Sequence, residues 1–171
     1  RLGGKAMAIL MAREGARVLL VNRSAERGEA LAAEIAAEGG EASAFAADVT
    51  QSDQVAAMGE VVQERYGRLD ILCNNVGIGA APGRVEDVDD EAWNQLLPVN
   101  MTSAMLCSRV AVPLMRDSGG GGSIINVSSI AGALGLMSNE GAAAYAPTKS
   151  GVHGLTLSIA ADYATEGIRC N

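Results

Sequence analysis

Tyr145 and Lys149 are the clearest chemical signal in this 171-residue sequence, because they stand four positions apart at the expected start of a helix. Residues at positions i and i+4 lie on one helix face, one turn apart. A lysine ammonium beside a phenol stabilises the phenolate and lowers a tyrosine pKa from about 10. Such a tyrosine can exchange a proton with a substrate near neutral pH. The pair therefore indicates acid–base chemistry, although a solvent-facing pair would have the same spacing.

A serine and an asparagine are further candidates for the same site. The strand-like residues 123–128 lead into Ser128 and Ser129, and α/β proteins bind ligands beyond the carboxyl ends of their parallel strands. A serine hydroxyl there can hold a carbonyl oxygen beside the tyrosine, or it can be an ordinary strand-to-loop residue. Asn100 stands early in an expected helix, where it is either a site residue or a cap or kink residue.

Two more polar segments follow expected strands. Asn74-Asn75-Val76-Gly77 comes directly after one strand, and Asp48-Val49 comes after another. Both segments suit close approach to a ligand at the strand ends. The alternatives are a simple turn for the first segment and a cap of the helix that begins at residue 52 for the second.

The elements that must position these residues alternate along the chain between short apolar runs and longer helical patterns. This alternation predicts βαβ units in a doubly wound parallel sheet, a three-layer α/β/α fold. Expected strands cover residues 17–22, 42–47, 69–74, 123–128 and 168–171; expected helices cover 4–14, 25–38, 52–66, 89–116 (in two pieces around Pro98) and 144–165; loops cover 77–84 and 130–143.

Composition excludes several classes of protein. Thirteen Lys and Arg against 20 Asp and Glu give a net charge of −7, which argues against a nucleic-acid binder. No run approaches the roughly 18 apolar residues of a membrane span. The three cysteines lie far apart and His153 is the one histidine, so we expect free thiols in a reducing compartment and no metal site.

Taken together, these residues resemble the short-chain dehydrogenase/reductase family, including its members similar to 3-oxoacyl-[acyl-carrier-protein] reductase. The resemblance rests on Asn74–Gly77, Asn100, Ser128–Gly132 and the Tyr145-x-x-x-Lys149 pair, which occur in the family's order. It covers essentially the whole chain. It implies a Rossmann-like fold and hydride transfer between a nicotinamide cofactor and a carbonyl or secondary alcohol substrate.

The resemblance also implies a role for each catalytic residue. Tyr145 would be the general acid in reduction or the base in oxidation, and Lys149 would assist it and bind the nicotinamide ribose. Ser129, which we prefer over Ser128, would polarise the substrate oxygen, and Asn100 would hold a water in the proton relay. The cofactor-binding residues would be Gly4, Asn22, Arg23, Asp48 (as an acceptor for an adenine amine), Val49, Asn75, Val76, Gly77, Tyr145 and Lys149.

The choice between NADP and NAD depends on the end of the strand at 17–22. Rossmann proteins that prefer NAD place a carboxylate there, whereas a nearby arginine accommodates the 2′-phosphate of NADP. This sequence has Asn22 followed by Arg23. A guanidinium is therefore available to pair with a phosphate, and we expect NADP to be preferred over NAD.

The sequence also departs from the family. Only Gly4 falls on an expected position of the glycine-rich motif, Val76 replaces an alanine, and loop 133–143 carries an insertion of about three residues. Both ends look cut, so we expect one NAD(P)-binding domain over 1–171, part of a cytoplasmic homo-oligomeric enzyme of roughly 250 residues. Strands 17–22 and 69–74 would then have unpaired edges or close together around a missing strand. The alternatives are a non-catalytic Rossmann cofactor-binding module and an inactive fragment of such an enzyme.

Overall fold

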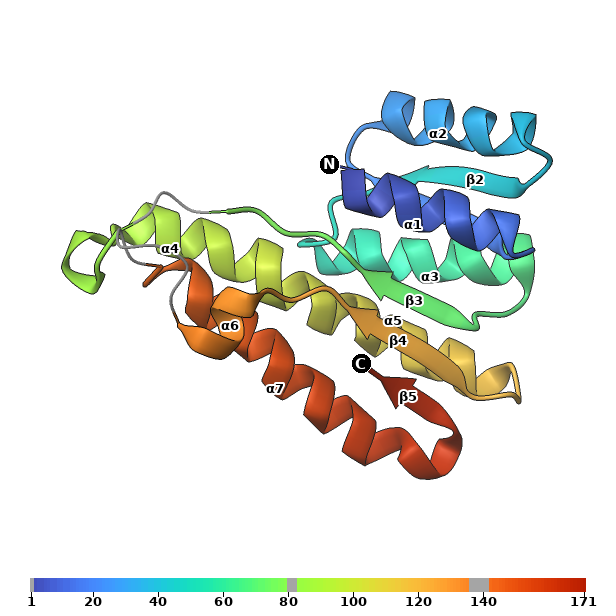
Figure 1. The fold of residues 1–171 in the computed structure, drawn as a ribbon. Helices are drawn as coiled ribbons and strands as arrows, with labels where there is room; N and C mark the ends of the chain where they lie inside the picture. Colours follow the sequence, from blue (N-terminus) through green and yellow to red (C-terminus); the bar gives the residue numbers. More distant parts are fainter. Residues whose placement is uncertain (1, 80–82, 136–141) are drawn as a thin grey trace. The chain divides into compact units, whose positions relative to one another are not determined.

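The computed structural model describes residues 2–79, 83–135 and 142–171. The chain divides into two compact units, Arg1–Gly67 and Arg68–Asn171 (Figure 1). Every predicted strand is present, in the predicted order and within two residues of the predicted start and end. The prediction of one domain over 1–171 stays a prediction.

The first unit alternates helices and strands around a pair of parallel strands. Its elements are α1 (Leu2–Arg13), β1 (Arg17–Asn22), α2 (Ala25–Ala37), β2 (Glu41–Ala46) and α3 (Ser52–Tyr66). The register of the pair runs from Arg17 opposite Glu41 to Asn22 opposite Ala46. Ala8 and Ala12 of α1 pack with Ile35 of α2 in a buried cluster. Small alanine side chains let the two helices approach closely there.

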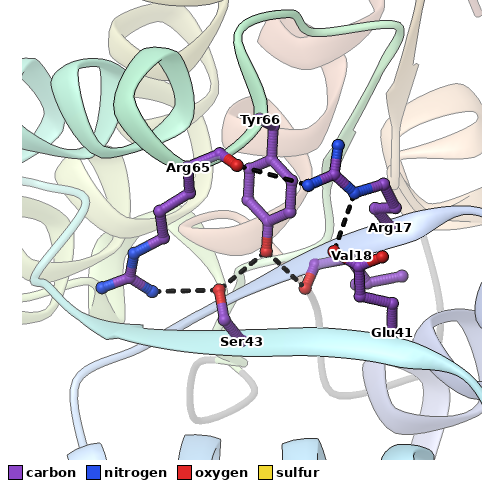
Figure 2. Close-up of polar contacts among 6 residues, drawn as sticks. All are labelled: Arg17, Val18, Glu41, Ser43, Arg65 and Tyr66. Carbon is purple, nitrogen blue, oxygen red and sulfur yellow. Dashed lines mark hydrogen bonds and ion pairs between the residues drawn. The ribbon is translucent and has the colours of Figure 1, made fainter.

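Polar contacts fasten the end of α3 to both strands of this unit (Figure 2). The hydroxyl of Tyr66 lies 2.7 Å from Oγ of Ser43 on β2 and 3.4 Å from the carbonyl oxygen of Val18 on β1. Arg65 donates to the same Ser43 oxygen at 2.9 Å. The guanidinium of Arg17 lies 4.9 Å from the centre of the Tyr66 ring, which adds a cation–π contact.

The second unit holds a parallel sheet of order β3-β4-β5, in which β4 lies between its neighbours (Figure 1). Met115 of α5, Ile124 of β4 and Ile168 of β5 are almost completely buried in one apolar cluster, which Ile159 of α7 joins. The elements are β3 (Ile71–Asn74), η1 (Val85–Asp87), α4 (Asp90–Leu97), η2 (Pro98–Thr102), α5 (Ser103–Asp117), β4 (Gly122–Asn126), α6 (Ile130–Leu134), α7 (Tyr145–Tyr163), η3 (Ala164–Glu166) and β5 (Ile168–Cys170).

β1 and β3 are each hydrogen-bonded to one neighbouring strand. Within the described ranges, β1 pairs with β2 alone and β3 pairs with β4 alone. Each strand therefore presents one edge without a strand partner from that part of the chain. None of the helices in the described part of the chain is both long and apolar enough to span a bilayer.

The prediction of a loop over 130–143 is wrong at its start, because Ile130–Leu134 form the short helix α6. Ser129 caps its first turn, and Gly135 ends it with a φ of +72°, a conformation that glycine adopts without strain. Five residues are too few to show a helical period in the sequence, so only the cap and the glycine could have indicated this helix. Residues 136–141, which make up about half of the loop 133–143 predicted to carry an insertion, lie outside the described residues.

The helix predicted over 89–116 changes its winding at Pro98, where the sequence predicts a division. α4 ends at Leu97, and residues Pro98–Thr102 then form a π turn before α5 begins. The chain thus continues in one helical path, since proline needs no N–H at the start of a turn. Such π turns are frequent at functional sites.

Gly132 allows α6 to lie directly against the backbone of α7. A Cβ atom on Gly132 would lie 2.7 Å from the carbonyl carbon of Lys149 and 2.9 Å from the nitrogen of Ser150. The side chain of Ser150 donates to the carbonyl of Gly132 across the same contact. The two helices are therefore in direct contact through their backbones at Gly132.

We predict that Gly132→Ala destabilises the protein by about 1–3 kcal/mol, because the added methyl meets backbone atoms that cannot move aside. Gly154→Ala is the matched control on α7, where an added Cβ would have no heavy atom within 4 Å. It should stabilise the helix by about 0.5–1 kcal/mol. Urea unfolding measures both changes, and equal stability of the two variants would contradict the close contact.

Candidate active site

The first turn of α7 presents Tyr145 and Lys149 one helical turn apart. The chain enters the helix through Ala142, whose carbonyl accepts from the N–H groups of Tyr145 at 3.1 Å and Ala146 at 2.9 Å. The Tyr145 side chain is half-buried, whereas Lys149 is only 4% exposed. A half-buried phenol and a buried cation are thus carried by one helix.

The ammonium of Lys149 donates to the carbonyl oxygen of Val127 at 2.9 Å, directly beyond the end of β4. A buried ammonium is costly unless it is hydrogen-bonded, so this contact fixes the position of the Lys149 ammonium. Ser128 strengthens the junction, because its hydroxyl donates to the carbonyl of Lys149 at 2.9 Å. The end of β4 and the start of α7 hold one another through these two bonds.

Asn100 is buried in the π turn and joins three parts of the site. Its Oδ1 accepts from the N–H of Ile78 at 2.7 Å, and its Nδ2 donates to the carbonyl of Ile78 at 3.0 Å and to Oγ1 of Thr148 at 3.1 Å. Both amide hydrogens therefore have acceptors inside the protein. Oδ1 has two lone pairs, and the bond from Ile78 uses one of them, so the predicted role of Asn100 in holding a water stays a prediction.

Ser128 and Ser129 have different tasks in the structure. Ser128 uses its hydroxyl hydrogen on Lys149, whereas Oγ of Ser129 accepts from the N–H of Ala131 at 3.2 Å and caps α6. The capping bond leaves the hydroxyl hydrogen of Ser129 for another acceptor. This difference favours Ser129 over Ser128 as the residue that holds a substrate oxygen.

The segment after β3 reaches the same place. Gly77 lies against the ends of Lys149 and Asn100. Asn75 is half-buried and Val76 is 44% exposed. The second unit therefore brings the four predicted catalytic residues and Asn75–Gly77 to the carboxyl edge of β3 and β4.

A polar network beneath the site was not predicted from the sequence. Asn74 donates to Oδ1 of Asn126 at 2.8 Å and to Ser108 of α5 at 3.2 Å, while Asn126 donates to Thr156 of α7 at 2.8 Å. These bonds connect β3 and β4 to helices α5 and α7. Asparagine as the last residue of two neighbouring strands is the signal that could have revealed the network.

The remaining predicted cofactor residues lie in the first unit. The N–H of Ala47 donates to the carbonyl of Asn22 at 3.1 Å, which places the segments after β1 and β2 side by side. Arg23 and the Asn22 side chain are exposed, while Val49 is buried. Gly4 lies in the first turn of α1.

Asp48 does not cap α3. Its Oδ1 accepts from the N–H and the hydroxyl of Thr50 at 3.0 and 2.7 Å. These two bonds, with a smaller contribution from the charge of Arg23, lower the pKa of the Asp48 carboxyl below its usual value. A carboxylate that stays ionised is a suitable acceptor for an amine, and Gln51, not Asp48, stands at the cap position of α3.

The three cysteines are free thiols whose pKa values are raised by burial. All three are free, and burial raises the pKa of the Cys107 thiol to about 11. A thiol that stays protonated at neutral pH is a poor nucleophile and a poor metal ligand. Nowhere in the described ranges do three or more His, Cys, Asp or Glu side chains gather.

Known proteins with similar sequences and structures share this arrangement of elements. A family model described as short chain dehydrogenase matches residues 3–171. A 3beta-hydroxysteroid dehydrogenase of Mediterraneibacter gnavus is 45% identical over 98% of this chain and 59% of its own length. A trans-4-hydroxycyclohexanecarboxylate dehydrogenase of Sinomonas cyclohexanicum is 41% identical over 98% of this chain and 65% of its own.

A solved structure is also similar to this chain. A metagenomic short-chain oxidoreductase in complex with NADP has a TM-score of 0.87 and 37% identity, and the match covers 97% of this chain and 73% of that one. The chain spans about three-fifths of the length of the curated relatives it matches. The family resemblance predicted from the sequence motifs is confirmed: this chain belongs to the short-chain dehydrogenase family and has its parallel, Rossmann-like α/β fold.

Proposed function

We propose that the protein carrying this chain is an NADP-dependent oxidoreductase that interconverts a secondary alcohol and a ketone, with Tyr145 as the proton donor and acceptor. The observation that carries the proposal is the buried ammonium of Lys149, which donates to the Val127 carbonyl at 2.9 Å. Lys149 stands one helical turn after Tyr145 on α7. The positive charge of Lys149 stabilises the phenolate of Tyr145. The similar proteins named above include dehydrogenases and an NADP complex, which supports this assignment.

The described residues fit a nicotinamide cofactor with a 2′-phosphate. β1 ends in an amide, Asn22, rather than a carboxylate, and Arg23 is exposed beside it. A carboxylate there would repel a phosphate, whereas a guanidinium pairs with it. Asp48 and Val49 follow the end of β2, and Asn75, Val76 and Gly77 follow the end of β3; dinucleotides bind at such strand ends in this fold. Gly4, in the first turn of α1, is also assigned to the cofactor.

In reduction, the phenol of Tyr145 gives its proton to the substrate oxygen while the carbonyl carbon receives a hydride. NADPH, when bound, would supply that hydride. Ser129 donates its remaining hydroxyl hydrogen to the same oxygen and polarises the carbonyl. Lys149 compensates the negative charge that the phenol acquires, and it would hold the ribose of the cofactor. Oxidation runs through the reverse transfers.

The substrate is proposed to be an apolar, ring-bearing alcohol or ketone. Ile130 and Leu134 of α6, directly after Ser129, are 57% and 69% exposed. Apolar side chains exposed next to the reacting oxygen suit an apolar substrate. The hydroxysteroid and hydroxycyclohexanecarboxylate dehydrogenases similar to this chain carry ring alcohols in their names. A non-catalytic cofactor module would not need the intact set of Tyr145, Lys149, Ser129 and Asn100.

We predict that Tyr145→Phe lowers kcat by at least about a hundredfold, because the phenylalanine ring has no proton to give. The dissociation constant of NADPH should stay within about twofold. Turnover of a 3β-hydroxysteroid and fluorescence titration measure the two quantities. Tyr163→Phe, at the other end of the same helix, is the matched control and should leave kcat unchanged. A Tyr145→Phe protein with normal turnover would remove Tyr145 from its assigned role.

We predict that NADPH binds more tightly than NADH and that Arg23→Ala reduces the ratio of the two affinities by about tenfold, which is about 1.4 kcal/mol. Loss of the guanidinium removes the charge-assisted bond to the 2′-phosphate but no contact that NADH makes. Arg68→Ala removes the same charge before β3, at the strand end away from the site, and should leave the ratio unchanged. Equal affinities for the two cofactors in the unmodified protein would contradict the proposal.

A further inference from the structure

Gly77 occupies a point where two side chains of the candidate site converge. A Cβ atom built on Gly77 would lie 3.1 Å from Nζ of Lys149 and 3.3 Å from Oδ1 of Asn100. Carbon atoms in proteins rarely approach other heavy atoms so closely. The space that a side chain at residue 77 would occupy therefore lies directly beside the lysine ammonium.

The backbone gives no other reason for a glycine here. The positive-φ glycines of the described residues do not include Gly77, so alanine can adopt its conformation without strain. An alanine at this position would change the space around Lys149 and Asn100, and it would not force a new backbone geometry.

The two neighbours differ in how easily they can move. The Asn100 amide is buried and held by Ile78 and Thr148 through three hydrogen bonds. The ammonium of Lys149 ends a four-carbon chain with several rotatable bonds. A methyl group at residue 77 would therefore shift the ammonium by a few tenths of an ångström from its place beside Val127 and leave the amide in place.

We propose that Gly77 is a positioning residue for Lys149: without a side chain at residue 77, the ammonium has the space to reach the Val127 carbonyl. Its consequence for catalysis rests on the proposed function, in which the lysine charge stabilises the phenolate. The placement of the ammonium itself does not rest on that function. One measurement can therefore test the position of the lysine, and another can test the effect of that position on the reaction.

Gly79 provides a matched control in the same loop. An added Cβ there would have no heavy atom within 4 Å, and its φ is not positive either. Gly77→Ala and Gly79→Ala thus make the same chemical change two residues apart, in crowded and in open space. Both variants should melt within about 2 °C of the unmodified protein, because only the flexible end of a side chain moves in the first.

The first readout follows the lysine in the apo protein. With ¹³C- and ¹⁵N-labelled lysine, the Lys149 signals are assigned as those missing from Lys149→Met, and Lys5, bonded to Glu34 at 2.7 Å, is the reference. We expect Gly77→Ala to move the Lys149 signals and leave those of Lys5 in place. Gly79→Ala should move neither. Unchanged Lys149 signals in Gly77→Ala would overturn the proposal, even if NADPH binding were weakened.

The second readout is kcat at saturating NADPH. In Gly77→Ala kcat should fall by about threefold to fivefold, because a shift of a few tenths of an ångström costs that much at roughly a hundredfold per ångström of misplacement. Gly79→Ala should leave kcat unchanged. If the Lys149 signals move while kcat of Lys149→Met equals that of the unmodified protein, Gly77 positions the lysine but the proposed acid–base role fails.

Discussion

The ammonium of Lys149 is the constraint on which the rest of the candidate site depends. It is 4% exposed, and an ion so far from water is costly, by several kcal/mol, unless fixed polar groups surround it. The Val127 carbonyl at 2.9 Å is one such group. The end of β4 and the start of α7 must therefore keep one relative position for the charge to be tolerated. Tyr145 is held in that position because it stands one turn earlier on the same helix.

Several contacts with no reacting atom of their own maintain this arrangement. Ser128 bonds to the backbone of Lys149, and Gly132 lets α6 lie against the same turn. Asn126 of β4 donates to Thr156 of α7, which stands about two helical turns after the lysine. Asn100 joins the π turn and the loop after β3 to Thr148. These contacts come from η2, α6, α7, β4 and the loop after β3, so the site depends on most of the second unit.

The sequence predicted the strands well, because buried parallel strands are short apolar runs between helices. It also singled out Tyr145, Lys149, Asn100 and Ser129 by their types and spacing; the structure brings them to one edge of the sheet, and their catalytic roles stay predictions. Contacts across the fold could not be predicted in this way. The bonds of Asn100 to Ile78 and of Asn126 to Thr156 join residues 22 and 30 positions apart, and no local pattern records such pairs. Helix α6 was missed because five residues show no period.

The central claim is that the charge of Lys149 assists proton transfer at Tyr145, and kcat of Lys149→Met at saturating NADPH tests it most directly. Methionine fills the same space without the charge, and Lys5→Met removes a charge at the surface of α1 as the control. The account predicts that kcat falls by at least about a hundredfold in Lys149→Met, while Lys5→Met leaves it unchanged. An equal kcat in all three proteins would contradict the account.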